Sequence, residues 1–230
     1  YQDISNMKIM VNGEDSGYEI NEDDLGNKMI YVEWKPEDTE RKVTYSFDVT
    51  RREALRPEVK EETAIDANEF APYLVDSKLL NISGNIKDKA IEITKDKESV
   101  YDKERAIYDW IYDNMKRNND VVGCGTGDVE NLLKTLNGKC TDIGSVFIAM
   151  SRAIGVPARE TFGVRMSKDD KADMTKGQHC WVEYYQPGTG WFPIDIADVL
   201  KGILTKECTK DSKEAIDLKD YFWGNFDANR

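Results

Sequence analysis

The chemistry that this sequence can support begins with His179, the only histidine among 230 residues. Histidine is the side chain whose ordinary pKa suits general-base work near neutral pH. Cys140 stands at the start of an apolar stretch with helical spacing, where the positive end of a helix dipole favours the thiolate. Asp195 follows on a predicted neighbouring strand. In chain order, Cys140, His179 and Asp195 supply the nucleophile, base and orienting carboxylate of a Cys-His-Asp triad.

A predicted β-hairpin around the turn sequence QPGTG places His179 relative to Asp195. If paired residue numbers sum to 376, Asp195 lies diagonal to His179, and a sum of 374 places the two directly opposite. Either register puts both side chains on one face of the hairpin, whereas an odd sum separates them. We therefore expect a carboxylate-imidazole hydrogen bond of about 3 Å. If Asp195 faced away, Asp198 or Glu183 would be the carboxylate to consider.

The elements that must position these residues are visible as a change of periodicity along the chain. Before about Val75, apolar and polar residues alternate over Val43–Val49, and Met7–Val11 and Met29–Trp34 make two more candidate strands. Beyond it, apolar residues recur about every 3.6 positions, as in amphipathic helices. Helices are expected over residues 82–93, 100–115, 129–136 and 140–154, and strands over residues 161–166, 180–185 and 191–196. The charged tail from Lys201 is expected to be loop-like.

This change divides the chain into a β-rich N-terminal segment, residues 1–75, and a mixed core, residues 76–230. The first segment contains no histidine or cysteine. Its alternating strand has only a packing explanation. We therefore expect residues 1–75 to be accessory, packing against the core and shaping one wall of the substrate groove.

The composition excludes several classes of partner. The chain has 32 basic and 44 acidic residues, a formal net charge of −12. A surface of that sign repels phosphate groups, so no nucleic acid is expected to bind. The longest uninterrupted apolar run is VFIAM, far short of the roughly 20 residues of a transmembrane helix. The four cysteines form no C-x-x-C pair, and no metal ion or other cofactor is expected.

Three blocks of the sequence resemble the transglutaminase-like superfamily. They are GKCTDIGSVFIAMSRAIGVPAR, GQHCWVEYY and GWFPIDIAD. They carry a Gly-x-Cys motif heading a helix, a His followed by a Trp, and a Gly-Trp before the acidic residue. The similarity is specific over about Tyr101–Ala197 and looser in the tail YFWGNFDAN and around FDVTRRE. The chain departs from bacterial members in its glycine-rich loop, where Cys124 replaces a frequent aromatic residue.

The resemblance implies an α+β fold with a papain-like core, in which the helix bearing the nucleophile packs on an antiparallel sheet. It makes Cys140 the nucleophile, His179 the base and acid, and Asp195 the orienting carboxylate. Arg159 and Trp181 would be structural residues around the site. The implied function is a cysteine-dependent amide-bond hydrolase or acyl transferase that acts on a peptide or protein through a thioester on Cys140. Because bacterial members are often exported and the chain does not begin with Met, an extracytoplasmic location is expected.

Two other interpretations stay open at this point. The chain could keep the fold as a catalytically inactive binding or structural module, as superfamily members that lack triad residues do. A zinc site made of Cys140, His179 and Cys180 is disfavoured, because adjacent His and Cys residues cannot easily bind one ion and no fourth ligand is suitably spaced.

Overall fold

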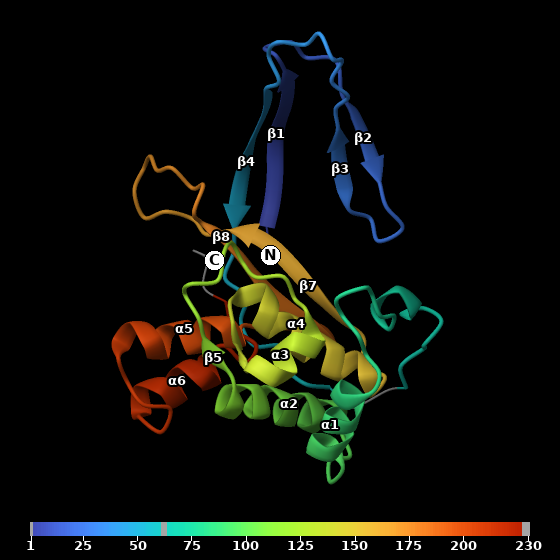
Figure 1. Ribbon diagram of the computed structural model, residues 1–230, viewed down its shortest axis with the longest axis vertical. Helices are drawn as coiled ribbons and strands as arrows, with labels where there is room; N and C mark the ends of the chain where they lie inside the picture. The colour runs from blue at the N-terminus through green and yellow to red at the C-terminus, as the bar shows by residue number, and fades with distance from the viewer. Residues whose placement is uncertain (1, 61–63, 227–230) are drawn as a thin grey trace. The chain divides into compact units, whose positions relative to one another are not determined.

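The computed structural model describes residues 2–60 and 64–226, and the chain forms two compact units, Tyr1–Arg52 and Glu53–Arg230 (Figure 1). None of the helices in the described part of the chain is long and apolar enough to cross a membrane.

The N-terminal unit consists of two antiparallel strand pairs. β1 (Gln2–Val11) pairs with β4 (Val43–Arg51), and β2 (Glu19–Glu22) pairs with β3 (Lys28–Tyr31). β1, β3 and β4 overlap the three expected strands, whereas β2 was not expected. The half-buried face expected over Val43–Val49 is wrong, because three of its apolar side chains each stay 43% exposed. A two-stranded ribbon has too few strands to bury a face of its own.

Residues 53–75 belong to the second unit. They include the short 3₁₀ helix η1 (Ala71–Tyr73), and the ring of Phe70 lies 4.1 Å from that of Tyr185 in the sheet of this unit. The accessory role expected for residues 1–75 stays a prediction. The C-terminal part of this segment packs on the sheet of the second unit through Phe70.

The second unit is built on a three-stranded antiparallel sheet. The strands β7 (Ala158–Val164), β8 (Gln178–Gln186) and β9 (Gly190–Ile194) lie in the order β7-β8-β9. Val182 of β8 pairs with Ile194 of β9, which is the register with the sum of 376. This confirms the hairpin expected around QPGTG.

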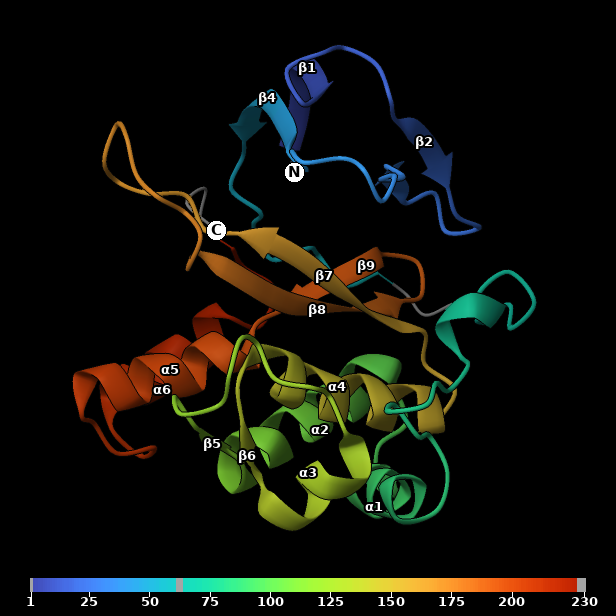
Figure 2. The same cartoon turned by 45° about the horizontal axis from the view of Figure 1, so that its top comes forward.

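Helices cover one side of this sheet (Figure 2). They are α1 (Asn85–Thr94), α2 (Val100–Asn114), α3 (Val129–Thr135), α4 (Cys140–Ala153), α5 (Ile196–Lys206) and α6 (Lys213–Tyr221). β5 (Lys116–Arg117), after α2, pairs in parallel with β6 (Asn137–Gly138), which precedes α4. The arrangement confirms an α+β fold in which the helix that begins at Cys140 packs on an antiparallel sheet.

Helix starts follow from capping residues in the sequence. The Ser99 side chain accepts a hydrogen bond from the Asp102 N–H at 3.0 Å, and that of Asp128 accepts one from the Asn131 N–H at 3.2 Å. Both bonds satisfy donors that a helix start leaves free. α4 has almost no exposed face, because apolar residues such as Phe147 are fully buried between the sheet and the other helices.

The loop-like tail expected from Lys201 is wrong, because α5 and α6 occupy most of it. Asp195 caps α5 through the Asp198 N–H at 2.9 Å, and Ser212 caps α6 through the Ala215 N–H at 3.2 Å. Both caps are residue types that favour helix starts. Most charged residues of the two helices are exposed or partly exposed, Asp198 being buried, and their number conceals the apolar stripes in a count of charge.

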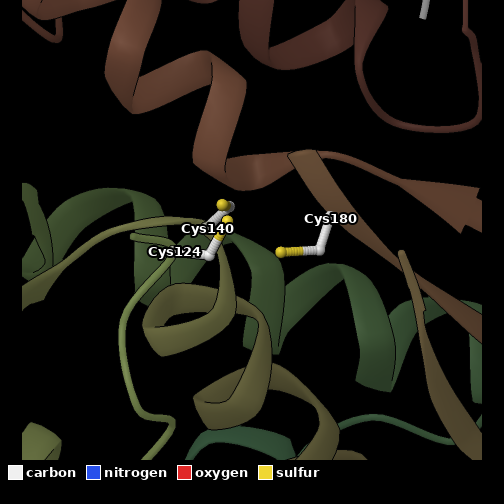
Figure 3. A group of neighbouring side chains, drawn as sticks. All are labelled: Cys124, Cys140 and Cys180. Carbon is white, nitrogen blue, oxygen red and sulfur yellow. The ribbon is translucent and has the colours of Figure 1, made fainter. Parts of the chain in front are cut away.

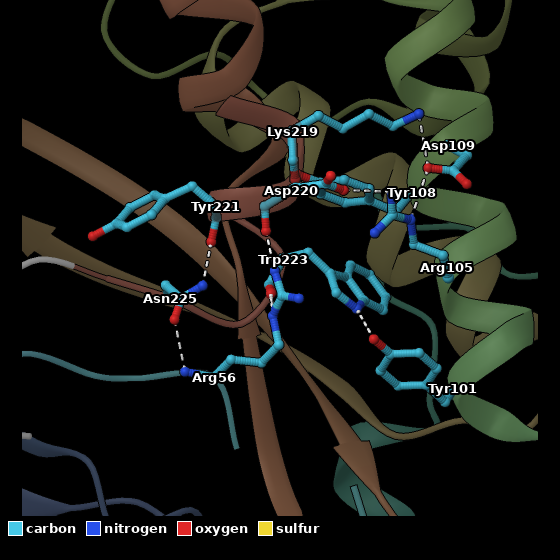
Figure 4. A network of polar contacts seen from close by, with 10 residues as sticks. All are labelled: Arg56, Tyr101, Arg105, Tyr108, Asp109, Lys219, Asp220, Tyr221, Trp223 and Asn225. Carbon is cyan, nitrogen blue, oxygen red and sulfur yellow. Dashed lines mark hydrogen bonds and ion pairs between the residues drawn. The ribbon is translucent and has the colours of Figure 1, made fainter. Parts of the chain in front are cut away.

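The segment after α6 is fixed by a network of polar contacts (Figure 4). The Trp223 indole N–H donates to the Tyr101 hydroxyl at 2.7 Å, and its carbonyl accepts from the Arg56 Nε at 2.5 Å. The Trp223 ring is fully buried against the rings of Tyr108 and Phe192. The C-terminal segment is therefore part of the core of this unit.

Candidate active site

Cys140 is the first residue of α4, and the carboxylate of Asp142 fixes the backbone around it. One Asp142 oxygen, Oδ2, accepts the Lys139 N–H at 3.0 Å, and the other, Oδ1, accepts the N–H groups of Thr126 and Gly127 at 2.9 and 3.0 Å. A buried carboxylate with three N–H donors is well satisfied. Asp142 thus ties the glycine-rich loop to the helix start that carries the Cys140 thiol.

Close packing against Asp142 explains one of the three glycines of this loop, Gly125. A Cβ atom at Gly125 would lie 2.1 Å from the Asp142 carboxylate, and its φ of +101° disfavours other residues. The loop also places the Cys124 carbonyl 3.0 Å from the Thr141 N–H, next to Cys140. Sequence reasoning missed Asp142, although its place two residues after the cysteine and the glycines that face it could have indicated a loop contact.

The structure brings His179 and Asp195 into direct contact. The His179 Nε2 atom lies 2.6 Å from Asp195 Oδ2, and both side chains are buried. This confirms the expected contact. Because Nε2 faces the carboxylate, the other ring nitrogen, Nδ1, remains for the hydrogen bond between His179 and the Cys140 sulfur. The three residues expected at the site therefore meet, and their order in space is thiol, imidazole, carboxylate.

Asp195 is held from two sides. Its Oδ1 atom caps α5, and its backbone N–H donates to the Phe222 carbonyl at 3.1 Å. Ile194 just before it forms a bridge with Trp223. Asp195 therefore stands at the junction of β9 and α5 and is also bonded to the C-terminal segment. These contacts orient its carboxylate toward His179.

The surroundings of Cys140 strongly favour its thiolate. The pKa of Cys140 falls to about 2, chiefly because the Cys180 thiol donates a hydrogen bond to its sulfur; burial opposes this, and the bonds with His179 and the Cys180 N–H add to it. Residues 178–181 of β8 continue beyond the pairing with β9, so the Cys180 N–H is free to point at that sulfur. The site thus holds the charged form of a cysteine.

The surroundings of His179 favour its protonated form. Burial lowers the pKa of His179, but the charge of Asp195 and its hydrogen bond outweigh burial, so the pKa is raised above its ordinary value. A thiolate beside an imidazolium is a nucleophile paired with a proton donor.

Two further thiols surround Cys140 (Figure 3). The sulfur atoms of Cys124, Cys140 and Cys180 all lie within 4.8 Å of one another. The hydrogen bond to Cys140 raises the pKa of Cys180, while burial and then the same thiolate raise that of Cys124. The sequence drew attention to Cys124 only as a departure from the family pattern, and it placed Cys180 beside Cys140 only in the disfavoured zinc site with His179.

The two carboxylates that were alternatives to Asp195 have other partners. Asp198 Oδ2 lies 3.9 Å from His179 Nε2, and its Oδ1 atom pairs with Arg165 at 2.5 Å. Glu183 pairs with Arg159 at 2.7 Å. Asp195 is therefore the carboxylate in hydrogen-bond contact with the imidazole.

Trp181 lies beside His179, whereas Arg159 lies farther along the β7-β8 ladder, opposite Glu183. The Arg159 guanidinium stacks 4.0 Å from the Trp191 ring centre, beside its ion pair with Glu183. The Trp181 ring lies between His179 and Phe226, at 6.2 and 5.3 Å from their ring centres. Both positions fit a supporting role, which stays a prediction.

Comparison with known proteins identifies the family. The model of the transglutaminase-like superfamily matches residues 87–196, which include all three residues of the site. A protein of Haemophilus influenzae whose function is uncharacterised is 32% identical, over 100% of this chain and 69% of its own length. The chain belongs to the transglutaminase-like superfamily.

Other relatives are more distant. The uncharacterised protein YebA of Bacillus subtilis is 26% identical over 66% of this chain, which covers 21% of YebA. A crystal structure described as a candidate cysteine protease from Cytophaga hutchinsonii has a TM-score of 0.57 and 22% identity over 85% of this chain and 66% of its own. This likeness shows the fold. The chain thus spans about two thirds of that protein and about a fifth of YebA.

Proposed function

We propose that this chain is a cysteine-dependent enzyme that hydrolyses or transfers acyl groups at amide bonds of a peptide or protein. The observation that carries the proposal is the Cys140 thiolate beside a buried imidazole that contacts Asp195 at 2.6 Å. Membership of the superfamily supports it, because the same residues were assigned to the triad from its motifs.

In the proposed reaction the Cys140 sulfur attacks the carbonyl carbon of the substrate amide and forms a C–S bond. The carbonyl π electrons move to oxygen and return as the C–N bond breaks. The His179 imidazolium gives its proton to the leaving amine, which leaves a thioester on Cys140. The neutral imidazole then takes a proton from water or from an incoming amine, whose oxygen or nitrogen bonds to the thioester carbonyl carbon. The C–S bond breaks and releases the Cys140 thiolate, and the product is that of hydrolysis or of transamidation.

The start of α4 supplies the first oxyanion donor in this proposal. Within the described chain, the Thr141 N–H donates to the Cys124 carbonyl, whereas the Cys140 N–H is the first of α4 and has no acceptor one turn earlier in the helix. A free N–H at a helix start is aligned with the helix dipole and stabilises developing negative charge. We assign this role to the Cys140 N–H.

The test of this proposal distinguishes water from amine as the acceptor. The protein is incubated with a glutamine-containing peptide and a labelled primary amine, beside Cys140→Ala and the matched control Cys208→Ala. Incorporated label indicates transamidation, and released ammonia or peptide fragments without label indicate hydrolysis. Either product must disappear in Cys140→Ala and persist in Cys208→Ala. A product that persists in Cys140→Ala would contradict the assigned nucleophile.

The extracytoplasmic location also remains a proposal, supported by the resemblance to exported bacterial proteins. Fractionation of cells that express the complete natural gene product tests it. The proposal expects the chain outside the cytoplasm, and recovery from the cytoplasmic fraction alone would contradict it.

A further inference from the structure

The three thiols around the start of α4 come from three separate elements. Cys124 lies in the glycine-rich loop, Cys140 begins α4 and Cys180 lies in β8. Figure 3 shows the three side chains converging at this point. The proposed acyl chemistry needs only one of these thiols, so the other two call for a separate explanation.

The spacing of the sulfur atoms suits a single metal ion. All three lie within 4.8 Å of one another. Three thiolates that bind zinc at about 2.3 Å lie roughly 3.8–4.0 Å apart, so the cluster needs to contract by no more than about 1 Å. We propose that Cys124, Cys140 and Cys180 bind one thiophilic cation of the Zn²⁺ type.

The backbone holds the three residues in place for such binding. The Cys124 carbonyl is bonded to the Thr141 N–H at 3.0 Å, and Cys180 is opposite Phe162 in the β7-β8 ladder. Only side-chain rotation is then needed to bring the sulfurs onto one ion. Cys124 is partly exposed, which gives the ion an approach from the loop side.

The protons balance simply. Cys140 is a thiolate before the cation binds. Cys124 and Cys180 each release a proton to solvent when their sulfur atoms coordinate the cation. Cys180 also leaves its contact with the Thr141 hydroxyl, 3.0 Å away. Because two protons leave, the affinity rises with pH.

A neighbouring carboxyl group favours a cation at this place. Glu160 hydrogen-bonds with the Cys180 thiol, and its Oε1 atom is buried with no hydrogen-bond partner within the described chain. A positive ion at Cys180 gives this carboxyl group a neighbour of opposite charge.

The nearby group of His179, Asp195 and Asp198 suits a soft cation less well. Its ligand atoms also lie within 4.8 Å of one another, but Asp198 is paired with Arg165 and the imidazole is bonded to Asp195. Soft thiolate ligands select zinc-like ions over hard cations such as Mg²⁺. The sulfur cluster is therefore the site that we assign.

Bound at Cys140, the cation occupies the sulfur electron pair that would attack the substrate. Only this inhibitory consequence rests on the proposed function. Binding itself is measured without activity, so a failure of the enzymatic proposal and a failure of the metal site are distinguishable.

The first experiment titrates the full chain with Zn²⁺ against a chromogenic chelator, and with Cd²⁺ while recording the sulfur-to-metal charge-transfer band. We expect one ion per chain, with Mg²⁺ unable to compete. Cys124→Ser and Cys180→Ser should each weaken binding by about 100-fold or more, since a lost ligand costs at least as much as a lost supporting contact. The matched control Cys208→Ser should bind as the wild type does. Unchanged affinity in both ligand variants would overturn the site.

A second experiment needs no variant, so it decides the matter even if a serine variant fails to fold. The native protein is alkylated with iodoacetamide, with and without one equivalent of Zn²⁺, and each cysteine is followed by mass spectrometry. We expect Zn²⁺ to slow the labelling of Cys124 and Cys140 together and to leave that of Cys208 unaffected. Protection of Cys140 alone, or no saturable protection, would overturn the proposal.

Discussion

At the scale of single residues, the site combines one activated sulfur with a buried imidazole-carboxylate pair. The types and order of Cys140, His179 and Asp195 could be predicted from the sequence, because each has a motif. The QPGTG turn left two registers open, and both place His179 and Asp195 on one face of the hairpin. The contacts of Cys124, Cys180 and Asp142 could not, because they depend on how a loop, a strand end and a helix start meet in space. The spacing of apolar residues along the chain indicates local structure and does not show contacts between distant segments.

Asp195→Asn tests the carboxylate through the pKa of His179. Asparagine keeps the cap of α5 but removes the charge that holds the imidazole proton, so we expect the raised pKa of His179 to fall. Since His179 is the only histidine, its ring proton is followed by nuclear magnetic resonance without ambiguity. We expect activity toward an amide substrate to fall roughly 10²–10⁴-fold.

Asp198→Asn is the matched comparison, because Asp198 lies 3.9 Å from the same nitrogen but pairs with Arg165. It should change the pKa of His179 and the activity less. A larger effect in Asp198→Asn than in Asp195→Asn would transfer the orienting role to Asp198.

At the scale of elements, the order and type of most core segments could be predicted, since α1 to α4 follow the apolar stripes and the capping residues Ser99 and Asp128. α5 and α6 were not predicted, because the many charged residues of these helices obscured the apolar residues that recur with helical spacing. The stripe Ile196, Val199, Leu200 and Ile203 is present in the sequence and has helical spacing.

Gly125→Ala tests the packing of the glycine-rich loop on Asp142. The added Cβ would meet the carboxylate at 2.1 Å, whereas at Gly123, also at positive φ, a Cβ meets nothing within 4 Å. We expect Gly123→Ala to lower the free energy of unfolding by about 1–2 kcal/mol and Gly125→Ala by at least about 2 kcal/mol more. Urea unfolding measures both. Equal losses would show that the loop does not depend on this contact.

Glu104 in α2 predicts a pH-dependent stability. Burial raises its pKa to about 8 from an ordinary 4.5, although Ser151 donates to one oxygen at 2.6 Å. Between these two pKa values the folded chain binds more protons at Glu104 than the unfolded chain, so its contribution to stability decreases as pH rises through this window.

Glu104→Gln removes this titration and keeps an acceptor for Ser151. At pH 8 we expect the variant to be more stable than the wild type by about 1–3 kcal/mol, each kcal/mol being about 2–4 °C in Tm. Near pH 4 the difference should vanish. Glu98→Gln, at an exposed position, is the control and should not change the slope. An unchanged slope in Glu104→Gln would contradict a neutral Glu104 in the fold.

At the scale of the whole molecule, the fold class could be predicted from three motif blocks, but the boundary between compact units could not. The change in periodicity near Val75 marks where helices begin. Residues 53–75 belong to the unit that carries the site, although the described ones, 53–60 and 64–75, form no regular strand. Their contacts, such as the Arg56 Nε bond to the Trp223 carbonyl, are made with a segment far along the chain.

Two truncations separate these segments. Removing residues 1–52 should leave the Tm of the remaining unit and the alkylation of Cys140 nearly unchanged. Removing residues 1–75 should lower Tm by several degrees, because Phe70 no longer covers Tyr185 and the C-terminal segment loses Arg56. If the variant that lacks residues 1–52 keeps a native near-ultraviolet circular dichroism spectrum but loses Cys140 reactivity, residues 1–52 contribute to the site.

The central claim is that Cys140 is an activated thiolate, and the rate of its alkylation against pH tests this most directly. Each cysteine of the native protein is followed by mass spectrometry during reaction with iodoacetamide. Because the pKa of Cys140 is lowered to about 2, its rate should stay nearly level from about pH 5 to pH 8, whereas the rate of a free cysteine in solution falls about tenfold per pH unit below its pKa of about 8.5. A Cys140 rate that falls with pH in parallel with that of free cysteine, or a rate no higher than that of Cys208 at neutral pH, would contradict the account.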